Sequence, residues 1–221
     1  MSIDPKSDPK RKIAMRAAKE IKPGQVINLG IGIPTLIPEF LGKDMSLTIH
    51  SENGIIGAGK SSGPARADRN LIDAGGTYIT TVLGAAFCDS SVSFALVRGG
   101  RLDLAFLGAL EISEKGDLAN WIIPGKFAPG IGGGMELAQK AKRLVITTTH
   151  ATKNASAKIL KKCTLPLTAS ACVDMIITEL AVIKVSRNGL VLKEISEETD
   201  LETVIGLTEA PLIISDDLTR F

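Results

Sequence analysis

The segment Ser51-Glu52-Asn53-Gly54 holds the side chain best suited to chemistry. Glu52 follows an apolar, β-prone run over residues 45–50, and the Asn53-Gly54 pair favours a sharp turn directly after it. Residues 55–59 are small and glycine-rich, so they leave a carboxylate at this strand end uncovered. A carboxylate held in this way can attack an electrophilic carbon, and the segment therefore predicts a nucleophile at Glu52.

A glycine-rich run from Gly130 to Gly134 is the second candidate for a reactive site. It stands where a loop becomes a predicted helix over residues 135–140, so unpaired backbone N–H groups and the positive end of the helix dipole face one small volume. Such a place suits a developing oxyanion, which needs donors without intruding side chains. A flexible lid or a simple helix cap would use the same glycines.

A third glycine-rich turn, at Gly30 and Gly32, follows a predicted strand over residues 26–29 and opens a helix. With Glu52 about 20 positions further on, it is similar to a dinucleotide-binding fingerprint. Thr35 stands where the third glycine should be, and Pro34 lies inside the turn, which weakens that interpretation. The glycines could instead leave room for a ligand beside the next strand, or form a structural turn.

Alternating helices and strands must position these residues. Asp8 and Pro9 are typical of a helix start and Pro23-Gly24 of its end, while residues 1–8 form a loose lead-in. Further helices are predicted up to Leu41, over residues 89–97 and over residues 135–140. Strands are predicted over residues 26–29, 47–50, 78–83, 102–107 and 144–148. This order predicts an α/β fold with a mostly parallel sheet flanked by helices.

After residue 149 the pattern changes to closely spaced strands over residues 175–178, 181–185 and 190–192. Asn188-Gly189 is a hairpin signal between the last two, so a small antiparallel C-terminal addition is expected. We interpret residues 1–221 as a single domain, because one α/β domain often reaches this length.

Composition excludes several classes of protein. The 26 basic and 24 acidic residues leave a net charge of only +2, which argues against a nucleic-acid partner. No apolar run approaches the roughly 18 to 20 residues that span a membrane. Three cysteines and two histidines without metal-ligand spacing predict no metal site and a reduced, cytoplasmic compartment.

Two further polar features each have an ordinary explanation beside a functional one. Asn120, next to the only tryptophan, could position a polar ligand or satisfy a turn, and Trp121 itself is interpreted as a packing residue. Lys60, Arg66 and Arg69 could contact phosphates, but they also fit a solvated loop.

Taken together, the motifs resemble the β subunit of family I CoA-transferases of the 3-oxoacid type, which includes succinyl-CoA:acetoacetate and butyrate/acetoacetate enzymes. The resemblance covers residues 13–216. Its motifs are residues 28–35, 51–54, 108–109, 116–121, 130–135 and 162–168. Two places depart from the family pattern, and both leave the acyl acceptor open: Gly76 stands where a lysine often follows the Ala-Gly pair, and the loop over residues 60–66 lacks a Pro-aromatic-Pro run.

The resemblance implies specific roles. Glu52 would be the nucleophile, forming a glutamyl-CoA thioester in a ping-pong reaction, and the backbone of Gly133 would be an oxyanion donor. Coenzyme A would be a substrate rather than a cofactor, exchanged between an acyl-CoA and a small carboxylic acid such as acetoacetate. An α subunit would complete the site, in an α2β2 heterotetramer. The candidates for contacts with substrate or CoA are Gly30, Gly32, Asn53, Gly54, Asn120, Gly132 and Gly134.

Three alternatives remain at this point. The first is a nicotinamide-dependent oxidoreductase that uses Gly30, Gly32 and Glu52 for the dinucleotide. The second is a non-catalytic subunit on the same scaffold, and the third is a sugar-phosphate isomerase, whose fold the CoA-transferase fold resembles.

Overall fold

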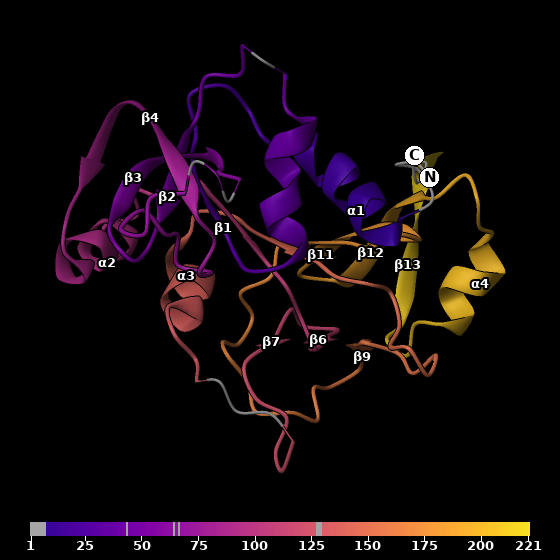
Figure 1. Ribbon diagram of the computed structural model, residues 1–221. Helices are drawn as coiled ribbons and strands as arrows, with labels where there is room; N and C mark the ends of the chain where they lie inside the picture. Colours follow the sequence, from indigo (N-terminus) through magenta and orange to yellow (C-terminus); the bar gives the residue numbers. More distant parts are fainter. Residues whose placement is uncertain (1–7, 43, 64, 66, 127–129) are drawn as a thin grey trace.

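A ten-stranded sheet runs through the molecule in the order β13-β12-β11-β10-β8-β5-β1-β2-β3-β4 (Figure 1). The computed structural model describes residues 8–42, 44–63, 65, 67–126 and 130–221, so most of the predicted lead-in and Arg66 lie outside the described residues. Strands from both halves of the chain share this sheet. The assignment of the chain as one domain stays a prediction.

The five central strands are parallel, as the alternating pattern predicts. They are β1 (Val26–Leu29), β2 (Thr48–Ser51), β5 (Leu104–Leu107), β8 (Leu144–Thr147) and β10 (Met175–Ile177). Every residue of β5 and β8 is buried, because layers cover both faces of a central parallel sheet. The carboxyl ends of β1 and β2 therefore lie side by side, and Glu52 directly follows β2.

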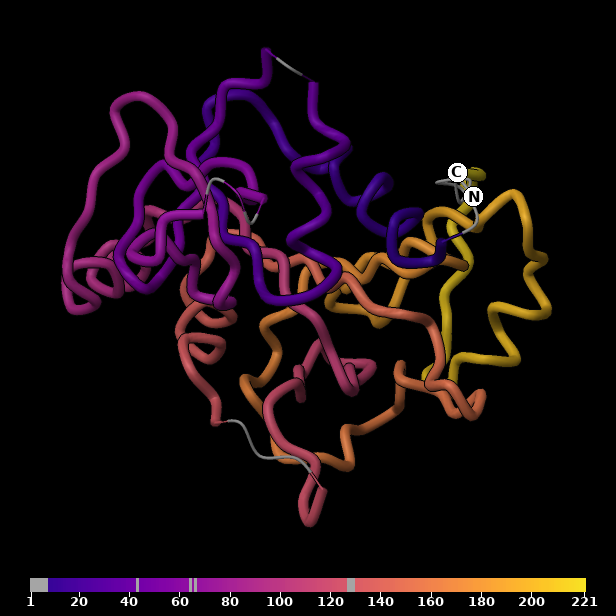
Figure 2. Tube along the Cα trace, in the orientation of Figure 1, coloured from indigo at the N-terminus to yellow at the C-terminus, as the bar shows by residue number. Residues whose placement is uncertain are grey.

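Antiparallel strands extend the sheet at both edges. At one edge lie β3 (Ile55–Ser61) and β4 (Ile79–Phe87). At the other lie β11 (Ala181–Ser186), β12 (Gly189–Ile195) and β13 (Leu212–Arg220). The hairpin at Asn188-Gly189 is confirmed, since Ser186 pairs with Gly189. β13 differs from the rest of this addition because it pairs parallel to β12. The trace in Figure 2 shows the two extensions at opposite ends of the molecule.

Two hydrophobic layers sandwich the central strands. On one face pack α1 (Pro9–Ala18) and the 3-10 helix η1 (Ile33–Phe40). On the other face pack α2 (Ser90–Arg98), α3 (Gly134–Lys140), α4 (Leu201–Gly206) and a small second sheet. That sheet contains β7 (Leu118–Ala119), β6 (Glu111–Ser113) and β9 (Ile159–Leu160). None of the described helices is both long and apolar enough to cross a bilayer.

Local sequence signals explain where the helices begin. The carboxylate of Asp8 accepts the backbone N–H of Lys10, and Pro9 is the first helical residue, as predicted. Asp89 caps α2 in the same way, by accepting the N–H of Val92 at 3.0 Å. The helix predicted up to Leu41 is a 3-10 helix. Pro38, inside this helix, lacks the N–H group that an α-helix would use at that position, which is consistent with the 3-10 form.

Candidate active site

Glu52 lies in a turn directly after β2, as the sequence predicts, and the turn leads into the antiparallel strand β3, which was not predicted. The N–H of Gly54 donates to the carbonyl of Ser51 at 2.9 Å and closes the turn. Gly54 has φ +121°, and a Cβ there would lie 2.0 Å from the carbonyl oxygen of Cys88. Only glycine fits this position, so Gly54 shapes the turn that leaves Glu52 half-buried at the end of β2.

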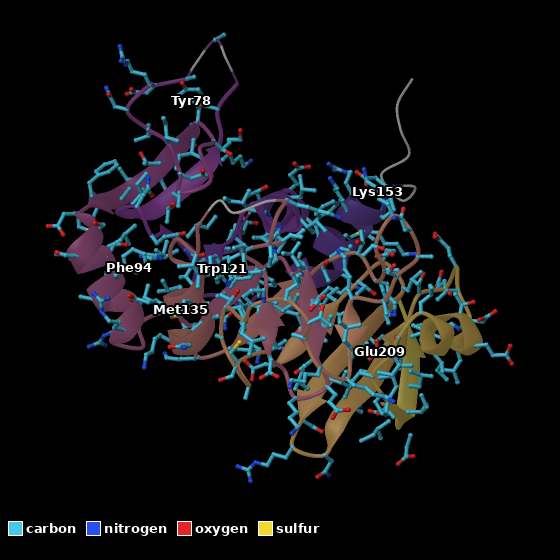
Figure 3. The ribbon with its side chains drawn as sticks, turned by 90° about the horizontal axis from the view of Figure 1, so that it is seen from below. Tyr78, Phe94, Trp121, Met135, Lys153 and Glu209 are labelled. Carbon is cyan, nitrogen blue, oxygen red and sulfur yellow. The ribbon has the colours of Figure 1, made fainter. Side chains whose placement is uncertain are left out.

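The glycine-rich loop before α3 lies against the same carboxylate side chain. A Cβ on Gly133 would be 3.1 Å from Cγ of Glu52 and 2.8 Å from Cζ of Phe94. Phe94 of α2 and Met135 of α3 lie on the same side of the molecule in Figure 3, far from Glu209. The structure thus brings together Glu52 and Gly133, which stand 81 positions apart in the sequence.

The N–H groups of Gly133 and Gly134 differ in their hydrogen bonding. Gly134 donates to the carbonyl of Ile131 at 3.2 Å, while no acceptor within the described part of the chain pairs with the N–H of Gly133. Gly132 is exposed with φ +51° and has no atom within 4 Å of an added Cβ. A glycine-rich loop with a backbone N–H that has no partner among the described residues, close to a carboxylate side chain, suits a developing oxyanion.

Asn28 of β1 also contacts the site, although the sequence motifs predicted no role for it. Its side-chain Nδ2 donates to Oε2 of Glu52 at 2.9 Å and to the carbonyl of His50 at 3.1 Å. The contact follows from the parallel pairing of β1 with β2, which places Asn28 opposite His50. A buried amide in the otherwise apolar strand Val26–Leu29 was the available signal.

His50 lies beneath the Glu52 carboxylate and is buried, so it is not exposed at the site. The ring is buried, and its Nε2 is 2.8 Å from Oγ of Ser93 on α2. Burial lowers the pKa of His50, and the nearby Glu52 carboxylate offsets part of that lowering. His50 is therefore neutral at physiological pH and contributes hydrogen bonds rather than charge.

Asn120 lies next to the glycine-rich loop that contains Gly133. Its Nδ2 donates to the carbonyl of Gly108 at 3.0 Å, and its Oδ1 accepts from Oγ1 of Thr168 at 2.6 Å. An added Cβ on Gly134 would lie 4.0 Å from the same Oδ1. Asn120 thus makes local hydrogen bonds and also lies beside the glycine-rich loop. Both predicted roles, satisfying a turn and positioning a polar ligand, are compatible with this place.

The remaining predicted contact residues are Gly30, Gly32 and Asn53. An added Cβ on Gly30 would be 2.9 Å from Leu107, so this glycine allows β1 to approach β5, whereas Gly32 has φ +95° and open space around it. The side chain of Asn53 is exposed and donates to the carbonyl of Ile72 at 2.7 Å.

The other polar and aromatic candidates lie outside the turn at Glu52. Lys60 and Arg69 are exposed. Trp121 donates from Nε1 to the carbonyl of Leu167 at 3.2 Å, which is consistent with a packing residue. No cluster of three or more possible metal ligands occurs in the parts of the chain that the structure covers.

Comparison with known proteins identifies the family. A family model described as Coenzyme A transferase matches residues 10–206. The chain belongs to the coenzyme A transferase family. The resemblance of the sequence motifs is therefore confirmed, and a nicotinamide-dependent oxidoreductase is not favoured. An acetate CoA-transferase β subunit of Haemophilus influenzae is 47% identical over 208 residues, covering 94% of this chain and 93% of the relative.

Two other CoA-transferases agree with this assignment. One subunit of a probable succinyl-CoA:3-ketoacid coenzyme A transferase of Bacillus subtilis is 42% identical over 209 residues, which cover 95% of this chain and 97% of the relative. An acyl-CoA transferase of Escherichia coli O157:H7, solved as a thioester complex with CoA, has a TM-score of 0.79 and 22% identity. The match covers 100% of this chain and 44% of the Escherichia coli chain. It confirms the predicted α/β fold.

Proposed function

We propose that Glu52 is the nucleophile of this CoA-transferase. Its carboxylate attacks the carbonyl carbon of an acyl-CoA, the carbon–sulfur bond breaks, and CoA leaves as the thiolate. The thiolate then attacks the glutamyl carbonyl of the mixed anhydride. This step releases the first acid as its carboxylate and leaves a glutamyl-CoA thioester, which a second carboxylate converts by the reverse steps.

The observation that carries this proposal is the placement of the two carboxylate oxygens. Asn28 holds Oε2 from the protein side at 2.9 Å. The other oxygen, Oε1, has no hydrogen-bond partner among the residues that the structure describes. One oxygen is therefore anchored while the other remains available for attack, in a side chain that is only half-buried.

The Gly133 N–H is the proposed donor to the oxyanion that forms when Glu52 attacks. A donor of this kind lowers the barrier by roughly 3–4 kcal/mol. Carboxylates are weaker nucleophiles than thiolates, so the anhydride lies uphill. Binding of the remote part of CoA must offset that cost, which the open glycines Gly32 and Gly132 would permit by close approach.

We also propose that a separate α-type chain covers this site, as a β subunit in an α2β2 assembly would require. Three large apolar side chains near the site's elements are strongly exposed: Ile31 after β1, and Leu83 and Phe87 of β4. Water must be excluded from the anhydride, and exposed apolar surface of this kind favours a protein partner. Both bacterial relatives are named as single subunits of their enzymes, which supports the same arrangement.

The proposed substrates are an acyl-CoA and a short-chain carboxylic acid, of which a 3-oxoacid such as acetoacetate is one candidate. One relative is named for acetate and the other for a 3-ketoacid, so both acids belong in the assay. CoA is a substrate in this scheme, and we propose no further cofactor and no metal. A cytoplasmic location stays a prediction.

The test is to assemble the full chain with an α-type chain and incubate it with acetyl-CoA, succinyl-CoA and acetoacetyl-CoA. Mass spectrometry should find the peptide containing Glu52 heavier by CoA less one water. Glu52→Gln should abolish both the adduct and turnover. Glu39→Gln is the matched control, since Glu39 is an exposed residue of η1 that pairs with Arg11 of α1. Undiminished turnover in Glu52→Gln, or an adduct on a cysteine, would contradict the proposal.

A further inference from the structure

Asn28 is a polar side chain at a buried position of the otherwise apolar strand β1. The side chain is 1% exposed, and its Oδ1 has no hydrogen-bond partner within the described residues. An unsatisfied buried acceptor costs about 1–3 kcal/mol. The two hydrogen bonds from Nδ2 oppose this cost, and the one that reaches Oε2 of Glu52 is charge-assisted.

The orientation of the amide follows from the groups around it. Two acceptors face Nδ2: Oε2 of Glu52 at 2.9 Å and the carbonyl of His50 at 3.1 Å. A flipped amide would place its oxygen against both of them. The NH₂ group must therefore face Glu52, and the carboxylate oxygen is drawn toward it by a charge-assisted hydrogen bond.

His50 extends this contact toward α2. Its Nδ1 lies 3.5 Å from the same NH₂ group, which has no acceptor to offer a proton on Nδ1, so the tautomer with its proton on Nε2 fits this environment. Nε2 then donates to Oγ of Ser93 at 2.8 Å. Ser93 is fully buried, and the next residue of α2, Phe94, packs against Gly133. One helix therefore supports both the carboxylate and the loop above it.

We propose that the buried chain Ser93–His50–Asn28 aims the Glu52 carboxylate, with Asn28 as a positioning residue. The hydrogen bond to Oε2 restricts rotation about the end of the side chain, which presents Oε1 to the thioester carbonyl. This inference rests on the proposed role of Glu52 as nucleophile. It adds that attack depends on a fixed carboxylate, and that α2 sets its direction through neutral His50.

The experiment compares variants in the full complex with an α-type chain. Asn28→Ala should slow formation of the CoA adduct on Glu52 and lower kcat by about 10²-fold, the usual effect of a misplaced reacting group. KM for the acyl-CoA should stay within about twofold, because Asn28 lies beneath the carboxylate. Ser93→Ala should lower kcat less, and Ser90→Ala, at the exposed start of α2, is its matched control.

Asn28→Asp separates positioning from a merely structural role. Two carboxylates within hydrogen-bond distance cannot both ionise easily, so the pKa of the pair rises. The ascending limb of the kcat–pH profile should move to higher pH by one unit or more. A profile that superimposes on that of the wild type, together with unchanged adduct formation in Asn28→Ala, would overturn the inference. Absence of any adduct on wild-type Glu52 would instead refute the nucleophile assignment.

Discussion

The backbone of Gly133 faces the side chain of Glu52 so closely that a methyl group on its Cα would lie 3.1 Å from Cγ of the glutamate. The same methyl group would be 2.8 Å from the ring of Phe94. The glycine therefore gives the carboxylate its space. The proposed nucleophile and the glycine-rich loop are therefore in close contact.

Gly133→Ala should consequently damage catalysis more than folding. The added methyl group must displace either the Phe94 ring or the Glu52 side chain, and a shift of about 1 Å in a reacting group costs about 10²-fold in rate. We expect kcat to fall by this factor while Tm changes by only a few degrees. The measurements are steady-state kinetics of the complex and thermal unfolding of the chain.

Gly206→Ala is the control for this comparison, since no atom lies within 4 Å of a Cβ on that residue at the end of α4. It should leave kcat unchanged. Equal rates for Gly133→Ala and the wild type would show that Glu52 does not depend on the loop.

Gly54→Ala should act in the opposite way, on folding itself. The new Cβ would lie 2.0 Å from the backbone oxygen of Cys88, and φ is +121°, so neither the contact nor the conformation can relax cheaply. We expect the free energy of unfolding to fall by about 3 kcal/mol or more, measured by urea denaturation.

Gly24→Ala isolates the conformational part of this cost. Gly24 also has a positive φ, +81°, but open space around its Cα. It should lose only about 1–2 kcal/mol. Similar losses for both variants would mean that the approach of Cys88 to the turn does not constrain it.

The difference between these glycines explains how much the sequence could predict. The turn at Glu52 and the glycine-rich loop are local patterns, a strand followed by turn residues and glycines before a helix, so both could be found in the sequence. The choice of Gly133 within that loop came from the family resemblance. Their contact depends on how α3 packs beside β2. No local pattern contains that information.

Several other elements were not predicted from the sequence. β6, β7 and β9 are two or three residues long, too short for any periodicity, and they were not predicted. α4 and β13 were also missed. Asn28 acquires its role only when β1 and β2 pair in parallel, which aligns residues more than 20 positions apart. Long-range pairing of this kind requires the fold.

The cysteines provide a check on where CoA becomes attached. Burial, with the carboxylates of Glu111 and Asp117 nearby, raises the pKa of Cys163 to about 12, and burial raises the pKa of Cys172 to about 12. At pH 8 only about one in 10⁴ of these thiols is ionised. Neither should compete with Glu52 as a nucleophile in the native chain.

We therefore expect iodoacetamide to label Cys163 and Cys172 about 10³-fold faster in urea than in buffer at pH 8, because unfolding restores an ordinary thiol pKa near 8.5. Peptide mass spectrometry over a time course measures both rates. Rapid labelling of either residue in the native chain would show that its thiol is not held in this buried state.

His150 should make the stability of the chain depend on pH. Its ring is fully buried after β8, between the hydroxyl groups of Thr178 and Thr208, each 2.9 Å away. Burial lowers the pKa of His150 from 6.5 to about 4. Between these two pH values the unfolded chain binds a proton that the native chain does not, so the free energy of unfolding falls as the pH decreases from about 6.5 to 4.

The lost stability should approach 3 kcal/mol, from about 1.4 kcal/mol for each unit of pKa difference. Urea denaturation of the full chain at several pH values measures it. His150→Gln should be less stable at pH 7 but lose less stability on acidification, because it has no group that titrates in this range. Since buried His50 contributes in the same direction, the variant should retain part of the slope; a slope identical to that of the wild type would show that His150 does not take up the proton on unfolding.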